Sequence, residues 1–286
     1  MSKNVYDMVT ERIIEELEKG RIPWQWERPW TGVRAGAYNR ISKKPYSLLN
    51  QLILGQDGEW ATFKQWSELG GHIRKGEKSS FVTFWKMQET EVEKEDGTKE
   101  IKQIPLLRYY NVFHISQVDG VEPLDIEKLN ADIKPIESAE KVLHDYWNRE
   151  GITLEQEASN KAYYSPMFDL IHLPLMEQFT NINEFYGTAF HESVHSTMKE
   201  SRCNRQEERK GKNVAFGSEE YSKEELVAEL GSADIMNILG IETTHSFRNS
   251  TAYIQSWIKA LRNDTRMIVS ASSKAEKAVK FILNEA

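Results

Sequence analysis

The segment His191–His195, which reads HESVH, constrains the fold of this chain more than any other sequence feature. In an α-helix, residues four positions apart lie one above the other on the same face, so a helical segment lets both imidazoles bind one metal ion. Apolar residues at helical spacing and Asn181 as a capping residue predict a helix over 181–199. The segment therefore indicates a site for Zn²⁺ or another divalent transition metal, with His191 and His195 as ligands and Glu192 as the catalytic residue.

A catalytic zinc site needs a third protein ligand and keeps its fourth position open for water. The next predicted helix, over 222–238, carries Glu225 and Glu229 on one face, so one carboxylate can bind the metal while the other accepts a hydrogen bond from a histidine ring. This acidic pattern resembles the third-ligand helix of gluzincin peptidases. By that analogy Glu225 is the ligand, and Glu229 is an outer carboxylate or the alternative ligand. Another interpretation stays open, because Ser222 and Glu225 would also form a capping box.

Such a site predicts metal-assisted hydrolysis, in which Glu192 takes a proton from water and returns it to a leaving amine. The chain has one cysteine, Cys203, which excludes an internal disulfide and a four-cysteine zinc module. Its 286 residues are 39% hydrophobic and 28% charged, as in globular proteins, and no apolar run reaches the length of a membrane span. We expect a cytoplasmic protein without a membrane partner.

Charge and tryptophan are unevenly distributed along the chain. The whole chain has a net charge of −7, but residues 21–86 contain eleven Lys and Arg against five Asp and Glu, and six of the eight tryptophans. A positive groove with aromatic faces is what binding of single-stranded DNA requires. The candidate contacts are Trp24, Trp30, Arg40, Lys44, Tyr46, Lys64, Trp66, Arg74 and Lys75. Alternatively, these aromatic residues form the core of a small domain with an ordinary charged surface.

The order of predicted elements indicates an α+β protein of two domains. Residues 1–120 combine helices over 4–19, 47–54 and 62–69 with strands over 81–87 and 106–113, which gives a small mixed domain with antiparallel strands. The polar segment 121–136 is the predicted linker. Residues 137–286 contain predicted helices at 138–149, 181–199, 222–238, 248–262 and 272–284, and a strand region at 162–173.

Several stretches together resemble the family of ArdC-type antirestriction proteins over nearly the whole chain. They are Pro23-Trp24, Pro29-Trp30, Asn39 to Asn50, Trp60 to Trp66, Gly70-Gly71, Arg74 to Glu77, Tyr164 to Pro166, Asp169, Ile171, Leu173-Pro174, Thr188 to His195 and Glu224 to Gly231. The resemblance implies an N-terminal domain that binds single-stranded DNA, followed by a zincin-like metallopeptidase domain.

The resemblance also implies a protein of a plasmid or phage that protects incoming DNA from restriction. Two alternatives remain: a non-catalytic DNA-binding protein with a structural metal, and an intracellular metalloprotease whose N-terminal domain recognises protein. A peptide substrate is expected only if the site is catalytic. Two segments depart from the family pattern. We expect residues 199–218 to form a mobile basic loop near the cleft, and residues 89–100 to form a solvated hairpin rather than a DNA contact.

Overall fold

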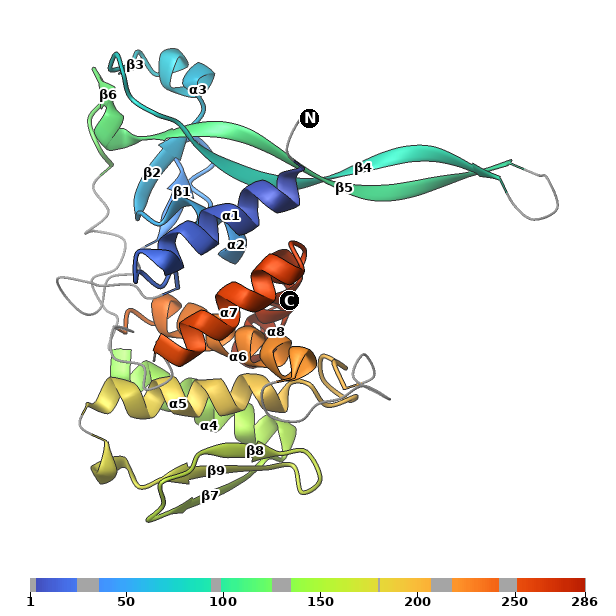
Figure 1. Ribbon diagram of the computed structural model, residues 1–286. Coiled ribbons are helices and arrows are strands. Elements are labelled where there is room, and N and C mark those ends of the chain that lie inside the picture. Colours follow the sequence, from blue (N-terminus) through green and yellow to red (C-terminus); the bar gives the residue numbers. More distant parts are fainter. Residues whose placement is uncertain are drawn as a thin grey trace.

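The computed structural model describes residues 4–24, 36–93, 99–124, 135–179, 181–206, 218–241 and 251–285. A sheet with a long hairpin forms one end of the molecule, and a bundle of helices over a small second sheet forms the other (Figure 1). None of the helices described here has both the length and the apolar character needed to cross a membrane.

The N-terminal half is built from short elements and one long strand pair. These elements are α1 (Val5–Glu18), β1 (Ala37–Asn39), α2 (Leu48–Leu54), β2 (Gly58–Ala61), α3 (Phe63–Glu68), β3 (His72–Ile73), β4 (Ser80–Glu93), β5 (Lys99–His114) and β6 (Val118–Asp119). The main sheet has the order β1-β2-β5-β4, and β3 pairs with β6. The predicted antiparallel pairing is confirmed for β4–β5. Strand β2, which was not predicted, also pairs antiparallel with β5, whereas β1 and β2 are parallel because the chain returns through α2 between them.

The C-terminal half contains α4 (Pro135–Glu150), β7 (Thr153–Glu157), β8 (Tyr163–Ser165), β9 (Leu170–Pro174), α5 (Ile182–Ser196), α6 (Glu219–Ile238), α7 (Thr251–Asn263) and α8 (Met267–Leu283). The second sheet has the order β7-β9-β8. The predicted strand region 162–173 is therefore a hairpin of two strands. The sequence analysis missed β7, because all five of its residues are exposed and show no apolar alternation.

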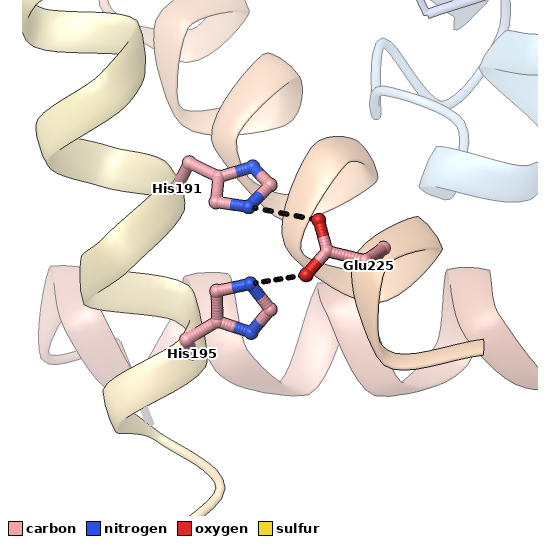
Figure 2. Close-up of side chains that lie close together, drawn as sticks. All are labelled: His191, His195 and Glu225. Atoms are coloured by element: carbon pink, nitrogen blue, oxygen red, sulfur yellow. Dashed lines mark ion pairs between the residues drawn. The ribbon is translucent and has the colours of Figure 1, made fainter. Parts of the chain in front are cut away.

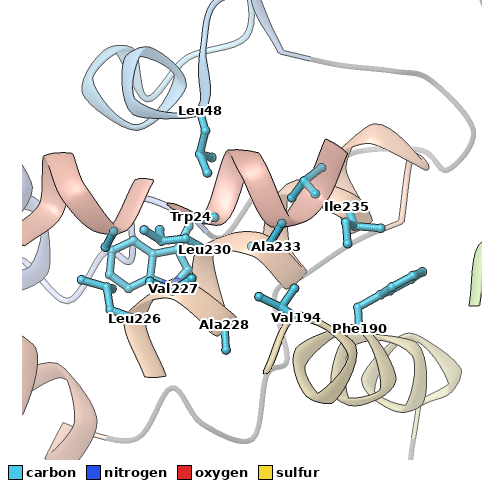
Figure 3. Close-up of a cluster of buried hydrophobic side chains, with 14 of the residues drawn as sticks. Trp24, Leu48, Phe190, Val194, Leu226, Val227, Ala228, Leu230, Ala233 and Ile235 are labelled. Atoms are coloured by element: carbon cyan, nitrogen blue, oxygen red, sulfur yellow. The ribbon is translucent and has the colours of Figure 1, made fainter. Parts of the chain in front are cut away.

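One hydrophobic core runs through both halves of the molecule. Helix α1 contributes Val9, Ile13 and Leu17 to the same cluster of buried side chains as α5, α6, α7 and α8. The ring of Trp24 lies in this cluster near side chains of α6 (Figure 3) and meets Trp257 of α7 edge-on at 5.1 Å between centroids. The N-terminal helices are thus packed directly against the C-terminal bundle. The predicted linker, 121–136, is described only at its two ends, so its boundaries stay a prediction.

Candidate metal centre

Helix α5 places the two histidines of the HESVH segment side by side. The side chain of Asn181 caps the helix by accepting a hydrogen bond of 2.9 Å from the Asn183 N–H, as the sequence predicts. His191 and His195 lie one turn apart, both are buried, and their ring centroids are 4.7 Å apart. Because both rings project from the same face of one helix, a third ligand from one further element is enough to complete a metal site.

Helix α6 supplies that element. The two carboxylate oxygens of Glu225 lie 3.6 Å from His191 Nε2 and 3.2 Å from His195 Nε2 (Figure 2). One ligand atom from each of these three residues can be chosen so that all lie within 4.8 Å of one another. Two imidazoles and one carboxylate are a donor set that fits Zn²⁺ and other divalent transition metals.

A glycine allows the two helices to approach closely. A Cβ atom on Gly231 of α6 would lie 2.9 Å from Val194 Cγ2 of α5, which is nearer than such atoms pack. The next residue, Ser232, donates a hydrogen bond of 2.7 Å to the carbonyl of Gly187, which lies seven residues before Val194 on α5. The close contact of α5 and α6 therefore depends on a small residue beside the motif.

Each histidine also faces a second carboxylate on its other ring nitrogen. Glu229 Oε1 lies 3.4 Å from His191 Nδ1, and Glu224 Oε1 lies 3.4 Å from His195 Nδ1. Such outer carboxylates orient the ring and fix which nitrogen is available to a metal. Glu229 was a candidate for this position from the sequence, but Glu224 was not. Glu224 and Glu225, which are adjacent in the sequence, face opposite ring nitrogens of His195.

Arg205 holds Glu224 in place and is itself buried. Its guanidinium donates to both Glu224 carboxylate oxygens, at 2.7 and 3.1 Å, to the Val194 carbonyl at 2.9 Å and to Thr197 Oγ1 at 2.7 Å. The sequence analysis assigned Arg205 to a mobile basic loop. That assignment is wrong for this residue, because its guanidinium is buried and is held by Glu224 of the next helix.

The charges of this cluster are strongly coupled. Burial alone would raise the pKa of Glu224, but Arg205 and His195 lower it to about 2. Burial alone would lower the pKa of His195, but Glu224 and Glu225 raise it to about 9. The cluster therefore holds positive charge at the position of His195, and a divalent metal would compete with the proton for that imidazole.

The start of α6 excludes the capping-box interpretation of Glu225. The helix begins at Glu219, and its N-cap is Ser218, whose hydroxyl accepts a hydrogen bond of 3.2 Å from the Tyr221 N–H. Ser222 is already inside the helix, so Glu225 lies in the second turn rather than at the cap. Burial of Glu225 between the two histidines, and not helix capping, accounts for its position.

Another arginine anchors the chain after α5 to the β8–β9 hairpin. Arg202 donates hydrogen bonds of 2.8 Å to both carboxylate oxygens of Asp169, and one of 3.2 Å to Glu150. Lys199 also contacts Asp169 at 2.6 Å. The first part of the expected mobile segment 199–218 is thus packed against the body of the protein. Residues 207–217 lie outside the described ranges.

Two tryptophans proposed as stacking platforms for DNA are core residues. Trp24 is 1% exposed and Trp66 is fully buried, with its indole N–H donating to the Phe113 carbonyl at 2.9 Å. Buried rings cannot stack on bases, so these two predictions are wrong, and the alternative that the aromatics build the core holds for them. Trp30 lies outside the described residues.

The predicted cationic contacts divide into paired and open side chains. Arg40 forms an ion pair with the buried Glu59, and Arg74 forms ion pairs with Glu77 and Asp119. Both guanidinium groups are thereby committed to carboxylates of the protein. Lys44, Lys64, Lys75 and the half-buried Tyr46 reach the surface, where Lys64 forms an exposed ion pair with Glu68 at 3.8 Å.

Family models match both halves of the chain. Residues 3–113 match a model described as the N-terminal domain of anti-restriction factor ArdC, and residues 139–274 match one described as a zincin-like metallopeptidase. Among curated proteins, two DNA primases TraC of Escherichia coli are 34% and 33% identical over 99% and 98% of this chain. The chain spans about a quarter of the first and a fifth of the second, at 27% and 20% of their lengths. An uncharacterized protein of Sinorhizobium fredii (strain NBRC 101917 / NGR234) is 31% identical and is covered over 91% of its length.

Solved structures give the same relationship over whole chains. The metal-free crystal structure of antirestriction ArdC protein from the R388 plasmid is 30% identical, with a TM-score of 0.75, and the match covers 99% of this chain and 100% of that one. The Mn(II)-bound structure of the same protein is 29% identical, with a TM-score of 0.73 and coverage of 99% and 98%. The two-domain α+β fold and both family matches agree with the sequence resemblance. The chain therefore belongs to the family of ArdC-type antirestriction proteins.

Proposed function

We propose that this protein binds single-stranded DNA that enters a cell on a mobile element, protects it from restriction in the cytoplasm, and carries a metal-dependent site for peptide hydrolysis. The observation that carries the hydrolytic part is the position of Glu225, which faces Nε2 of both histidines from a second helix. Burial of a carboxylate between two imidazoles costs free energy of folding unless a positive charge lies between these groups. A divalent cation supplies that charge, and so does the proton that His195 binds.

In this proposal His191, His195 and Glu225 are the metal ligands, with Zn²⁺ as the ion. Glu229 and Glu224 face the opposite ring nitrogens at 3.4 Å, and their charges favour ring orientations that keep both Nε2 atoms directed at the ion. When bound, such an ion polarises a substrate carbonyl and lowers the pKa of water. Because three protein ligands leave a position open, the donor set favours a catalytic over a closed structural site.

Glu192 is the proposed general base and acid. It follows His191 on α5 and is buried, so its carboxylate works in a low-dielectric environment where a proton is transferred without competition from bulk water. In hydrolysis it would accept a proton from the attacking water and deliver it to the leaving amine. A purely structural metal site needs ligands but no such group.

The DNA-binding part rests on the match of residues 3–113 to the N-terminal domain of ArdC. The proposed division is a DNA-binding domain of residues 1–120 and a metallopeptidase domain of residues 137–286. Of the predicted DNA contacts, Lys44, Tyr46, Lys64 and Lys75 remain in the proposal, since their side chains reach the surface.

The test separates metal binding, catalysis and protection. We expect His191→Ala to lose bound metal in elemental analysis, and Glu192→Gln to keep the metal and lose cleavage of a peptide library by at least about 100-fold. Protection of incoming plasmid DNA is then measured for both variants in a host with an active restriction system. If Glu192→Gln retains metal and protects as well as wild type, catalysis is not the antirestriction mechanism. If wild type fails to bind single-stranded oligonucleotides, the DNA part of the proposal is wrong and a protein-recognition role for the N-terminal domain replaces it.

A further inference from the structure

The β4–β5 hairpin is an arm that leaves the body of the protein. The two strands pair without interruption from Ser80 opposite Val112 to Glu93 opposite Lys99. At the root, Val82 and Val112 are fully buried, but from Phe84 onward most side chains are exposed. Figure 1 shows the twisted ribbon extending well beyond the helices. Such an arm exposes both of its faces to solvent, so either face is accessible to a ligand.

The two faces of the arm differ in charge. Directly opposite residues of an antiparallel pair project to the same side, and successive residues alternate between sides. One side, here called the cationic face, carries Phe84, Lys86, Lys102, Leu106, Arg108 and Tyr110 and no carboxylate between these positions. The opposite side carries Trp85, Met87, Glu89, Glu91, Ile101 and Tyr109. A polyanion is attracted by the first face and repelled by the carboxylates of the second.

An aromatic pair lies at the centre of the cationic face. Phe84 and Tyr110 are diagonal neighbours across the strands, with ring centroids 5.6 Å apart and planes inclined by 49°. Phe84 is 41% exposed and Tyr110 is 38% exposed, so both rings keep an open surface although each leans on the other. Rings held in this way lose little conformational freedom when a base stacks on them.

The cations beside this pair are available to a ligand. Within the described ranges, neither Lys86 nor Arg108 forms an ion pair with a carboxylate of the protein, whereas Arg40 and Arg74 do. Arg108 lies directly opposite Phe84 in the strand register, and Lys86 follows two positions along the same face. Phosphates next to a stacked base would therefore meet unpaired cations.

The cationic face continues onto the body of the protein through Tyr46. The hydroxyl of Tyr46 interacts with that of Tyr110, and burial together with this contact raises the pKa of Tyr46 to about 12. Lys44 is exposed two residues earlier. Tyr46, a contact predicted from the sequence, thus adjoins the root of the arm and joins the arm to the body of the protein.

We propose that the cationic face of the β4–β5 arm is the binding surface for single-stranded DNA, with bases on Phe84 and Tyr110 and phosphates at Lys86 and Arg108. This inference rests on the proposed DNA-binding function and specifies its site. Stacking needs unpaired bases, so the surface discriminates against duplex DNA. It also relocates the aromatic contacts from the buried Trp24 and Trp66 to the two predicted strands that flank the segment 89–100.

The experiment measures fluorescence anisotropy of a labelled oligo(dT) of about 20 nucleotides, longer than the site of one binding module, with the full chain. We expect Phe84→Ala and Tyr110→Ala each to weaken binding about 10-fold, and Phe84→Tyr to bind like wild type. Lys86→Ala with Arg108→Ala should reduce the slope of log affinity against log salt by about 1.4, because about 0.7 is lost for each phosphate contact on a single strand.

Matched variants on the same hairpin serve as controls. Trp85→Ala removes an even more exposed ring from the opposite face, and Lys99→Ala removes a cation that is already paired with Glu91 at 3.1 Å. Both are expected to bind within about twofold of wild type. If wild type binds the oligonucleotide but the cationic-face variants do so equally well, or the controls weaken binding as much, this assignment is wrong. If wild type does not bind at all, the proposed DNA-binding function itself fails. Circular dichroism confirms that each variant is folded.

Discussion

The metal cluster and the aromatic region of the N-terminal half were both conspicuous in the sequence, yet only one of them came together as expected. His191, His195 and Glu225 lie within a single cluster of side chains. Trp24 and Trp66, in contrast, are buried among apolar neighbours. The difference lies in what each pattern reports. Polar side chains four residues apart on a buried helix face need a charged partner, so their pattern indicates a metal site. A tryptophan, in contrast, can either pack in the core or stack on a base at the surface.

Among the variants that test this comparison, Trp24→Ala should have the largest effect on stability. Replacing it with alanine should cost about 4 kcal/mol of unfolding free energy, because it leaves a cavity between α7 and the N-terminal helices. Urea unfolding measures this loss. Affinity for single-stranded DNA, measured under conditions where the variant is folded, should stay at the wild-type value. If the variant is as stable as wild type but binds DNA poorly, Trp24 is a DNA-binding residue and not a core residue.

Glu225→Ala tests the metal cluster itself. Removal of the carboxylate that faces both Nε2 atoms should lower metal affinity by at least about 100-fold, or about 3 kcal/mol, which exceeds the usual effect of an outer partner. Competition with a chromophoric chelator gives the dissociation constant. Glu68→Ala, the same substitution at an exposed position of α3, is the control and should leave it unchanged. An affinity that survives Glu225→Ala but falls in Glu229→Ala would make Glu229 the ligand.

Asp169→Asn tests the anchoring of the chain that follows the metal helix. Burial would raise the pKa of Asp169, but Arg202, Lys199 and Tyr164 lower it to about 2. A lowered pKa stabilises the fold above the unfolded value near 3.8 and loses that contribution as the pH falls towards 2. At neutral pH we expect a loss of about 2 kcal/mol, since Glu150 still pairs with the buried Arg202.

The stability difference between wild type and Asp169→Asn should therefore shrink between pH 4 and pH 2, as followed by urea unfolding at each pH. Asp145→Asn, which alters an exposed pair with Lys141, is the matched control and should change stability by less than about 0.5 kcal/mol. A difference that does not depend on pH would mean that Asp169 acts by shape rather than by charge.

The smallest expected effect on metal affinity concerns Glu224, whose replacement also removes the carboxylate partner of the buried Arg205 and lowers the stability of the fold. Glu224→Gln keeps the shape of the side chain but removes the negative charge that faces His195 Nδ1, so metal affinity should fall about 10-fold. Isothermal titration calorimetry measures this change. Glu229→Gln makes the equivalent change at His191 Nδ1 and should have a similar effect on affinity. If only one of the two variants binds metal more weakly, the two histidines are not supported in the same way.

Local patterns in the sequence predicted most of the helices. The apolar spacing of α1 and the capping signal of α5 are properties of consecutive residues, and both helices form where expected. The strands β1, β2, β3 and β6 were missed because each has at most four residues and its partner lies elsewhere in the chain. Strand β7 was missed because its residues are all exposed. The hairpin strands β4 and β5 were predicted, but they run further than expected, to Glu93 and from Lys99, which lie within the polar segment 89–100.

The sequence by itself determined the helix that carries His191 and His195, because four-residue spacing becomes proximity in any α-helix. It also narrowed the third position of the cluster to Glu225 or Glu229. Only the tertiary structure brought Arg205 to Glu224, placed Trp24 in the core and aligned Phe84 with Tyr110 on one face of an arm. These contacts join residues that are distant in sequence. Burial and charge pairing at such distances depend on how whole elements pack, which a local pattern does not contain.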